Sequence, residues 1–159
     1  MTKDLQLYCS HNPWLSKITQ ELSSDIKFSR RKSSETVLYE DAYRENAYVE
    51  WNVTDWFIYD FTADELNTLK RIQPDAHRDP NYNLKESFCS FQEYIAIAKE
   101  HKVGIYPEIK YPYFVNSILN SRGHNITVEE LMINILSDNG YTDRTSNIWS
   151  FSYCFHNIY

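Results

Sequence analysis

The sequence predicts an α/β fold with parallel strands, and three observations lead to this prediction. Short apolar runs suited to strands occupy residues 5–10, 103–112 and 147–151. Patterns that open helices lie between these runs. Polar stretches without a clear period separate the remaining parts. The resulting order is strand, long loop, helix, loop, helix, strand, helix, strand, and such alternation is typical of α/β folds.

Each of the three expected helices begins with a Ser or Thr that is followed three residues later by a Glu. In such a capping box the two residues exchange hydrogen bonds and satisfy the free N–H groups of the first turn. The helices start at Thr62, Ser90 and Thr127. The second is expected to reach about His101, and Gly140 follows the third as a C-terminal signal.

Two loops connect these elements. Residues 19–55 are polar, with serines among mixed charges, and we expect them to form an irregular, poorly ordered loop. The basic cluster from Lys27 to Lys32 lies in it, and we interpret this cluster as a solvated loop rather than a binding site. Residues 71–86 are rich in Pro and Asn and form the second loop.

The run Val103–Pro112 places a carboxylate and an ammonium group two residues apart. Side chains alternate along a strand, so Glu108 and Lys110 are expected on the same side, with Ile109 directed into the packing. Pro112 is expected to end the strand. A carboxylate and a cation at a strand's end suit a metal ion and an anion that it neutralises. The alternative is a solvent-facing salt pair at a strand edge.

Composition excludes several classes of function. The chain has 159 residues, 42% hydrophobic and 24% charged, which suffices for one ordered domain. Its net charge of −6 argues against a nucleic-acid partner. It has only 3 glycines and no Gly-x-Gly pair, so the usual dinucleotide and P-loop cradles are excluded.

The cysteines and the apolar stretches suggest neither a covalent framework nor a membrane protein. Cys9, Cys89 and Cys154 are far apart and match no metal-binding or disulfide spacing. No stretch approaches the roughly 18 apolar residues of a transmembrane segment. The first residues lack the apolar core of a signal peptide, so we expect the chain as written to be cytoplasmic.

Several blocks of the sequence, in order, resemble glycerophosphodiester phosphodiesterases. The first block contains a Thr-Lys-Asp turn followed by a strand and a histidine, and a later block begins with Asp-Phe-Thr. Another contains Tyr-Pro-Glu-Ile-Lys before an aromatic-rich segment. The blocks are Met1–Asn12, Pro13–Thr19, Asp60–Lys70, Tyr106–Lys110 and Ile126–Phe151.

This resemblance implies a (β/α)8 TIM-type barrel of the PLC-like phosphodiesterase fold. Residues 1–159 would form a partial domain that supplies only some of its units. The implied reaction is the hydrolysis of a small-molecule glycerophosphodiester to an alcohol and glycerol 3-phosphate. His11 corresponds to one of two histidines that act as general acid and base. Glu108 corresponds to one of three carboxylates that hold a divalent cation, Mg²⁺ or Ca²⁺, and Lys110 to a lysine beside the substrate phosphate.

The sequence also departs from the family pattern. The family's His-Arg-Gly motif and its Glu-x-Asp strand are absent, Asn12 replaces an aspartate, and Trp149 stands where a glutamine is usual. We therefore expect an interior fragment with a weakly bound cation and little activity of its own. The alternative is a catalytically inactive remnant or binding module of the same fold. A partial barrel would also leave open sheet edges, through which we expect self-association.

Overall fold

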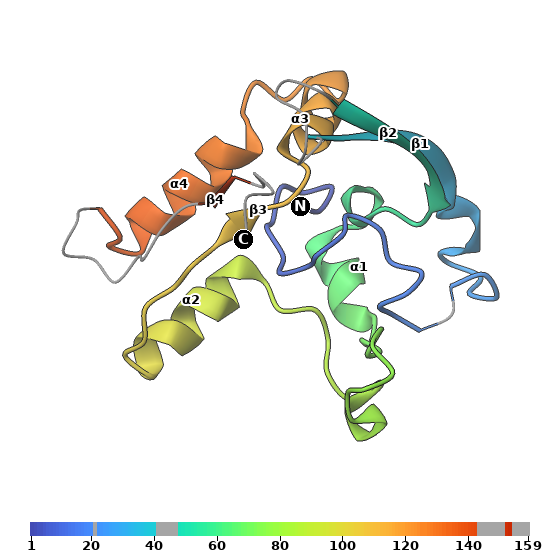
Figure 1. Ribbon diagram of the computed structural model, residues 1–159, viewed down its shortest axis with the longest axis horizontal. Helices are drawn as coiled ribbons and strands as arrows, with labels where there is room; N and C mark the ends of the chain where they lie inside the picture. The colour runs from blue at the N-terminus through green and yellow to red at the C-terminus, as the bar shows by residue number, and fades with distance from the viewer. Residues whose placement is uncertain (21, 41–47, 143–151, 154–159) are drawn as a thin grey trace. The chain divides into compact units, whose positions relative to one another are not determined.

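The computed structural model describes residues 1–20, 22–40, 48–142 and 152–153, and it has a mixed α/β architecture (Figure 1). The chain divides into two compact units. Unit 1 comprises Met1–Glu35 and Val53–Ser90, and unit 2 comprises Thr36–Asn52 and Phe91–Tyr159.

Unit 1 contains little regular secondary structure. Its described residues form one short helix, α1 (Ala63–Thr68), and the 3-10 turns η1 (Ser29–Arg31), η2 (Ile58–Asp60) and η3 (Pro80–Tyr82), the last of which lies in the predicted second loop.

The predicted strand over residues 5–10 is wrong as an extended element. Leu5 has a φ of 65°, and a turn from Thr2 to Gln6 occupies the beginning of this segment. Ladder contacts within this segment are limited to its second half, where Tyr8 forms an antiparallel bridge with Ser90 and the Cys9 nitrogen donates to the Cys89 carbonyl oxygen. The apolar residues alone therefore did not reveal that a turn occupies the first two residues of the segment.

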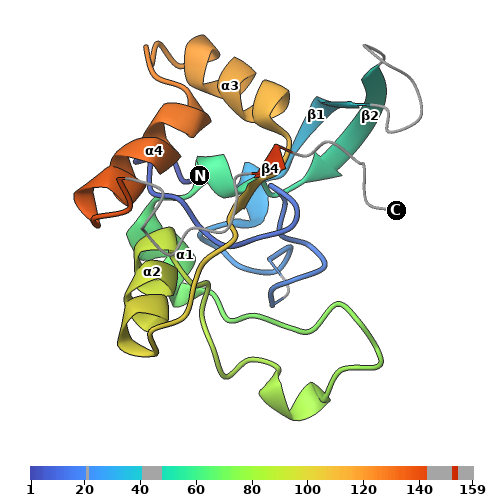
Figure 2. The ribbon, with the colours of Figure 1, turned by 60° about the vertical axis from the view of Figure 1, so that its left-hand side comes forward.

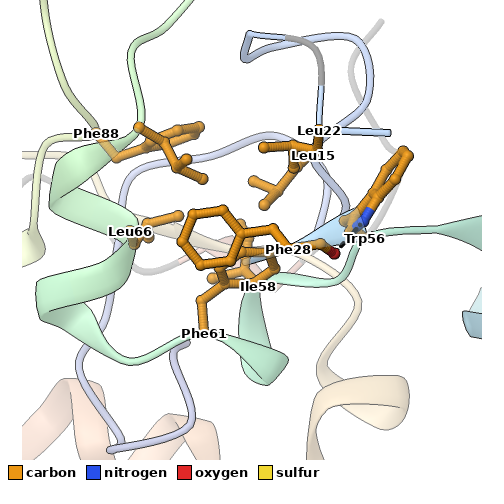
Figure 3. Packing of buried hydrophobic residues seen from close by; sticks show 9 residues of the cluster. Leu15, Leu22, Phe28, Trp56, Ile58, Phe61, Leu66 and Phe88 are labelled. Carbon is orange, nitrogen blue, oxygen red and sulfur yellow. Dashed lines mark hydrogen bonds between the residues drawn. The ribbon is translucent and has the colours of Figure 1, made fainter. Parts of the chain in front are cut away.

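A cluster of buried apolar side chains forms the centre of unit 1 (Figure 3). The Trp56 indole nitrogen donates a hydrogen bond of 2.9 Å to the Phe28 carbonyl oxygen. The rings of Phe28 and Phe61 pack at 47°, with centroids 5.1 Å apart. Each fully buried side chain of this size contributes about 1.5–3 kcal/mol of transfer free energy. The cluster consists of Leu15, Leu22, Phe28, Trp56, Ile58, Phe61, Leu66, Leu69 and Phe88.

The first residues of the chain are joined to the start of α1. The Lys3 backbone nitrogen donates to the Phe61 carbonyl oxygen at 2.8 Å. The Ala63 backbone nitrogen donates to Asp4 Oδ1 at 2.9 Å and thereby satisfies a free N–H of the helix. The Thr-Lys-Asp turn and the Asp-Phe-Thr helix start are therefore neighbours within unit 1.

Arg31 connects η1 to the first turn of α1. Its guanidinium donates to the two Glu65 carboxylate oxygens at 2.6 and 2.8 Å. The guanidinium carbon lies 5.2 Å from the ring centres of both Phe28 and Phe61. This hydrogen bonding is the main cause that lowers the pKa of Glu65 to about 2, and it outweighs the opposing effect of burial. Glu65 is therefore ionised throughout the neutral range.

The segment 19–55 is not one irregular loop. Two strands, β1 (Ser33–Glu40) and β2 (Tyr48–Asp55), pair with each other. The Ser34 and Thr54 hydroxyls lie 2.6 Å apart, and Thr36 Oγ1 donates to Asn52 Oδ1 at 3.0 Å. Since these pairs advance in opposite directions along the two strands, β1 and β2 run antiparallel.

Unit 2 contains helices α2 (Phe91–Glu100), α3 (Pro112–Ser121) and α4 (Val128–Asp138), with strands β3 (Glu108–Ile109) and β4 (Ser152–Tyr153). Helices α3 and α4 lie side by side (Figures 1 and 2). Asn116 joins them, because its amide accepts from the Val128 backbone nitrogen at 2.8 Å and donates to Glu129 at 2.9 Å.

The three predicted helix starts are confirmed. Both hydrogen bonds of the capping box are formed at Thr62 and at Thr127. Helix α2 begins directly after Ser90, as predicted. Gly140 follows α4 with a φ of 81°, the left-handed conformation that glycine adopts without strain.

The predicted α/β class is confirmed, and one pair of strands is parallel as predicted. Strands β3 and β4 pair in parallel, with Glu108 opposite Ser152 and Ile109 opposite Tyr153. Among the described residues each sheet has two strands. The strand predicted for residues 147–151 lies outside the described residues.

We predict that Glu65→Gln lowers the free energy of unfolding by up to about 3 kcal/mol at neutral pH. The folded pKa of about 2 lies below the ordinary value of 4.5, so the contribution is complete above pH 4.5. It is lost as the pH falls from 4.5 towards 2. Urea denaturation at a series of pH values, followed by tryptophan fluorescence, measures the difference between variant and wild type.

Glu130→Gln is the matched control, because Glu130 forms the same capping box at α4 and takes no part in the ion pairs found among the described residues. Its stability difference from wild type at neutral pH should be small. If the free energy of unfolding changed with pH in the same way for wild type and Glu65→Gln, the lowered pKa of Glu65 would not be the source of the stabilisation.

Candidate functional site

Glu108 and Lys110 form an ion pair at the end of β3. The Lys110 Nζ lies 2.8 Å from Glu108 Oε1, and the two side chains are 21% and 35% exposed, respectively. Ile105 and Pro107 are buried, whereas Tyr106 and Glu108 are exposed, so the side chains alternate as in a strand. The prediction that Glu108 and Lys110 share one side is therefore confirmed.

The predicted strand is shorter than its sequence suggested, and the role of Pro112 differs. Regular pairing covers only Glu108 and Ile109. Tyr111 then adopts a left-handed conformation, with φ 54° and ψ 49°, and Pro112 opens α3. Proline suits the first helical position because it lacks the N–H that would be unsatisfied there. Lys110 therefore lies in the tight turn between β3 and α3. Helix α3 was not predicted from the sequence.

The aromatic residues around this turn serve mainly to anchor α3. Phe114 is buried in unit 2 together with Val115 and Leu119. Tyr113 is 51% exposed and meets the ring of Tyr48 edge-on, with centroids 5.1 Å apart. Phe114 therefore fixes the helix that follows the Glu108–Lys110 pair.

His11 lies in unit 1, exposed in a bend after the Tyr8 bridge. Its Nδ1 is 2.9 Å from Asn12 Oδ1. An amide oxygen only accepts hydrogen bonds, so in the neutral ring Nδ1 carries the proton and Nε2 is left as an acceptor. Asn12 therefore orients the imidazole without a negative charge, a role that the sequence analysis had not assigned to it.

Within the described residues, the chain does not gather a complete set of metal ligands. No three His, Cys, Asp or Glu side chains come together into a group able to hold a metal ion. Glu108 is the predicted ligand, and Lys110 already contacts its carboxylate.

The basic cluster from Lys27 to Lys32 is not a free solvated loop. Arg31 pairs with Glu65, and Lys27 lies 3.6 Å from the same carboxylate. The Lys32 Nζ lies 4.8 Å from the Trp56 ring centre. These contacts attach the cluster to the core of unit 1. A cavity of about 480 Å³ adjoins it, lined by Lys3, Arg30, Arg31, Lys32, Ser33, Asp60, Thr62 and Glu65.

Comparison with known proteins identifies the relationship. The chain is 38% identical over 117 residues to glycerophosphodiester phosphodiesterase GDPD6 of Arabidopsis thaliana. The chain is related to the glycerophosphodiester phosphodiesterase family. The matched residues make up 72% of this chain and 28% of the length of that relative. No model of a protein family matches the chain.

This relationship confirms the resemblance inferred from the sequence blocks. The matched share of the relative is small, so this chain corresponds to a limited part of a glycerophosphodiester phosphodiesterase. In the described part of the chain, no helix has the length and apolar character needed to cross a bilayer.

We predict that Lys110→Met increases the affinity of Glu108 for a divalent cation by roughly three- to tenfold. A unit charge opposes a divalent cation about 8 Å away by about 1 kcal/mol even at the dielectric constant of water. Terbium luminescence sensitised by nearby tyrosines, with Ca²⁺ as competitor, measures the affinity.

Lys102→Met is the matched control, since Lys102 is exposed and lies in the same unit. It should leave the affinity close to that of wild type. Equal affinities for the two variants would mean that the Lys110 ammonium does not control access to Glu108.

Proposed function

We propose that this chain contributes to the metal-assisted hydrolysis of glycerophosphodiesters to an alcohol and glycerol 3-phosphate. The observation that carries the proposal is the 38% identity to a glycerophosphodiester phosphodiesterase over most of the chain. The Glu108–Lys110 pair at the carboxyl end of β3 supports it, because the end of a strand is where α/β enzymes carry their chemistry.

We further propose that β3 and β4 are strands of a PLC-like (β/α)8 barrel. Their parallel pairing supports this view, as do the helices α3 and α4 that lie between them in the sequence. A parallel pair requires a crossover connection, usually helical, and β3–α3–α4–β4 is such a connection.

The roles that we propose for the chain's own residues follow from their chemistry. Lys110 attracts the substrate phosphate as a compact positive charge. His11 transfers a proton through Nε2, the nitrogen left free by the hydrogen bond to Asn12. Glu108 offers carboxylate oxygens, which are the ligands that Mg²⁺ and Ca²⁺ prefer.

The donor set of the described residues does not fit a tightly held cation. A hard cation takes six or more oxygen ligands, and Glu108 is one carboxylate that is shared with Lys110. We therefore propose that this chain binds Mg²⁺ or Ca²⁺ weakly.

We also propose that the chain by itself hydrolyses substrate slowly, at least about 100-fold more slowly than a full-length relative. A single histidine supplies one of the two proton transfers, and each positioned acid or base contributes about 10²–10⁴-fold. The test measures release of glycerol 3-phosphate from glycerophosphocholine, with Mg²⁺ or Ca²⁺ and with a chelator.

The variants His11→Ala and Glu108→Ala should abolish any residual metal-dependent turnover. His101→Ala and Glu100→Ala are matched controls, because both residues are exposed at the end of α2, and they should behave as wild type. Turnover comparable to that of the full-length relative would refute the proposed slow rate. Residual turnover that survives both site variants would refute the proposed residues. Binding of glycerophosphocholine without hydrolysis would instead identify a binding module.

A further inference from the structure

Two cysteines that are distant in the sequence lie opposite each other beside an isolated antiparallel bridge in unit 1. Tyr8 and Ser90 form an antiparallel bridge. The backbone nitrogen of Cys9 donates to the carbonyl oxygen of Cys89 at 2.9 Å. Moving one residue forward from Tyr8 and one back from Ser90 therefore places Cys9 directly opposite Cys89.

This arrangement satisfies the main geometric requirement of a disulfide. Directly opposed residues in an antiparallel pair direct their side chains to the same face. Their Cα atoms lie about 5.5 Å apart when a hydrogen bond joins them, within the range of about 4.4–6.8 Å that disulfides span. Both cysteines carry reduced thiols and are half-buried, so solvent reaches them, and Cys89 Sγ donates to the Ser90 carbonyl oxygen at 3.3 Å.

The residues beside each cysteine hold the two segments in place. The Tyr8 hydroxyl donates to Asn67 Oδ1 of α1 at 2.8 Å. Phe88, which precedes Cys89, is only 2% exposed and belongs to the core cluster. The opposition of the two cysteines is therefore supported by the packing of unit 1.

We propose that Cys9 and Cys89 form a redox-sensitive pair that a small disulfide oxidant, such as oxidised glutathione, converts to an intrachain disulfide. The thiolate of one cysteine attacks the oxidant, forms a mixed disulfide and releases one reduced glutathione. The second thiolate then attacks the mixed disulfide and releases the second reduced glutathione. The two cysteines lose two electrons and two protons in total, and the oxidant gains them.

This disulfide would fix the segment that carries His11. His11 lies two residues beyond Cys9, in a bend held by local hydrogen bonds such as that of Ser10 to the Asn12 carbonyl oxygen. The cross-link would close a loop of about 80 residues that contains α1 and most of the core of unit 1. Oxidation would thus make unit 1 harder to unfold and its first segment less mobile.

The test uses the full chain with Cys154→Ser, which removes the third thiol. The folded chain is equilibrated with buffers of reduced and oxidised glutathione, quenched with acid and digested with trypsin without reduction. Mass spectrometry should find the peptide 4–17 joined to the peptide 86–99. The same equilibration in urea gives the disulfide equilibrium constant of the unfolded chain, in which the two thiols are not held opposite each other.

The disulfide equilibrium constant of the folded chain should exceed that of the unfolded chain by about tenfold or more. Thiols in a flexible chain meet at an effective concentration in the millimolar range, whereas opposed thiols meet more often. In the control that also carries Cys89→Ser, Cys9 should only form a mixed disulfide with glutathione. Equal constants in the folded and unfolded chain, or mixed disulfides at both cysteines, would overturn the proposal.

Discussion

Unit 1 depends on the charged contact between Arg31 and Glu65, because it has little regular secondary structure to hold it. The guanidinium bonds the Glu65 carboxylate and also lies over the rings of Phe28 and Phe61. One side chain thus attaches a 3-10 turn to both a helix and the aromatic core. The buried carboxylate of Asp55 acts similarly, since it accepts from the backbone nitrogens of Leu15 and Ser16, which are distant in the sequence, and from that of its neighbour Trp56. Such contacts replace the hydrogen-bond ladders that a larger sheet would supply.

The parts of the fold that were predicted correctly are those set by neighbouring residues. A capping box involves two residues three positions apart, so the helix starts at Thr62 and Thr127 could be read directly. Strands β1 and β2 were missed because most side chains of β2 are exposed and show no apolar alternation. Their β-branched residues, such as Val37 and Val53, were the signal that was available. Pro112 was read as the end of a strand, although it equally suits the first position of a helix.

The same distinction applies to the candidate site. The Glu108–Lys110 contact follows from the two-residue period of an extended segment, and this period needs only local geometry. The opposition of Cys9 and Cys89 depends on which segments pair, and their spacing in the sequence contains no such information. The basic cluster was misinterpreted for a related reason. Its partners Glu65 and Trp56 lie about 30 residues away, and a list of charges does not reveal them.

Under the proposed function, the ion pair at β3 would account for weak binding of a cation by this chain. Lys110 satisfies Glu108 in the absence of a metal, so an arriving cation must share the carboxylate with an ammonium group 2.8 Å away. Two further carboxylates, which the family resemblance implies for a complete site, would add enough negative charge to outweigh that ammonium. With the cation in place, Lys110 would be free to turn towards a phosphate. Under the proposed function, the short side-chain contact would be the resting arrangement of the site rather than a source of stability, since exposed ion pairs contribute only about 0–1 kcal/mol.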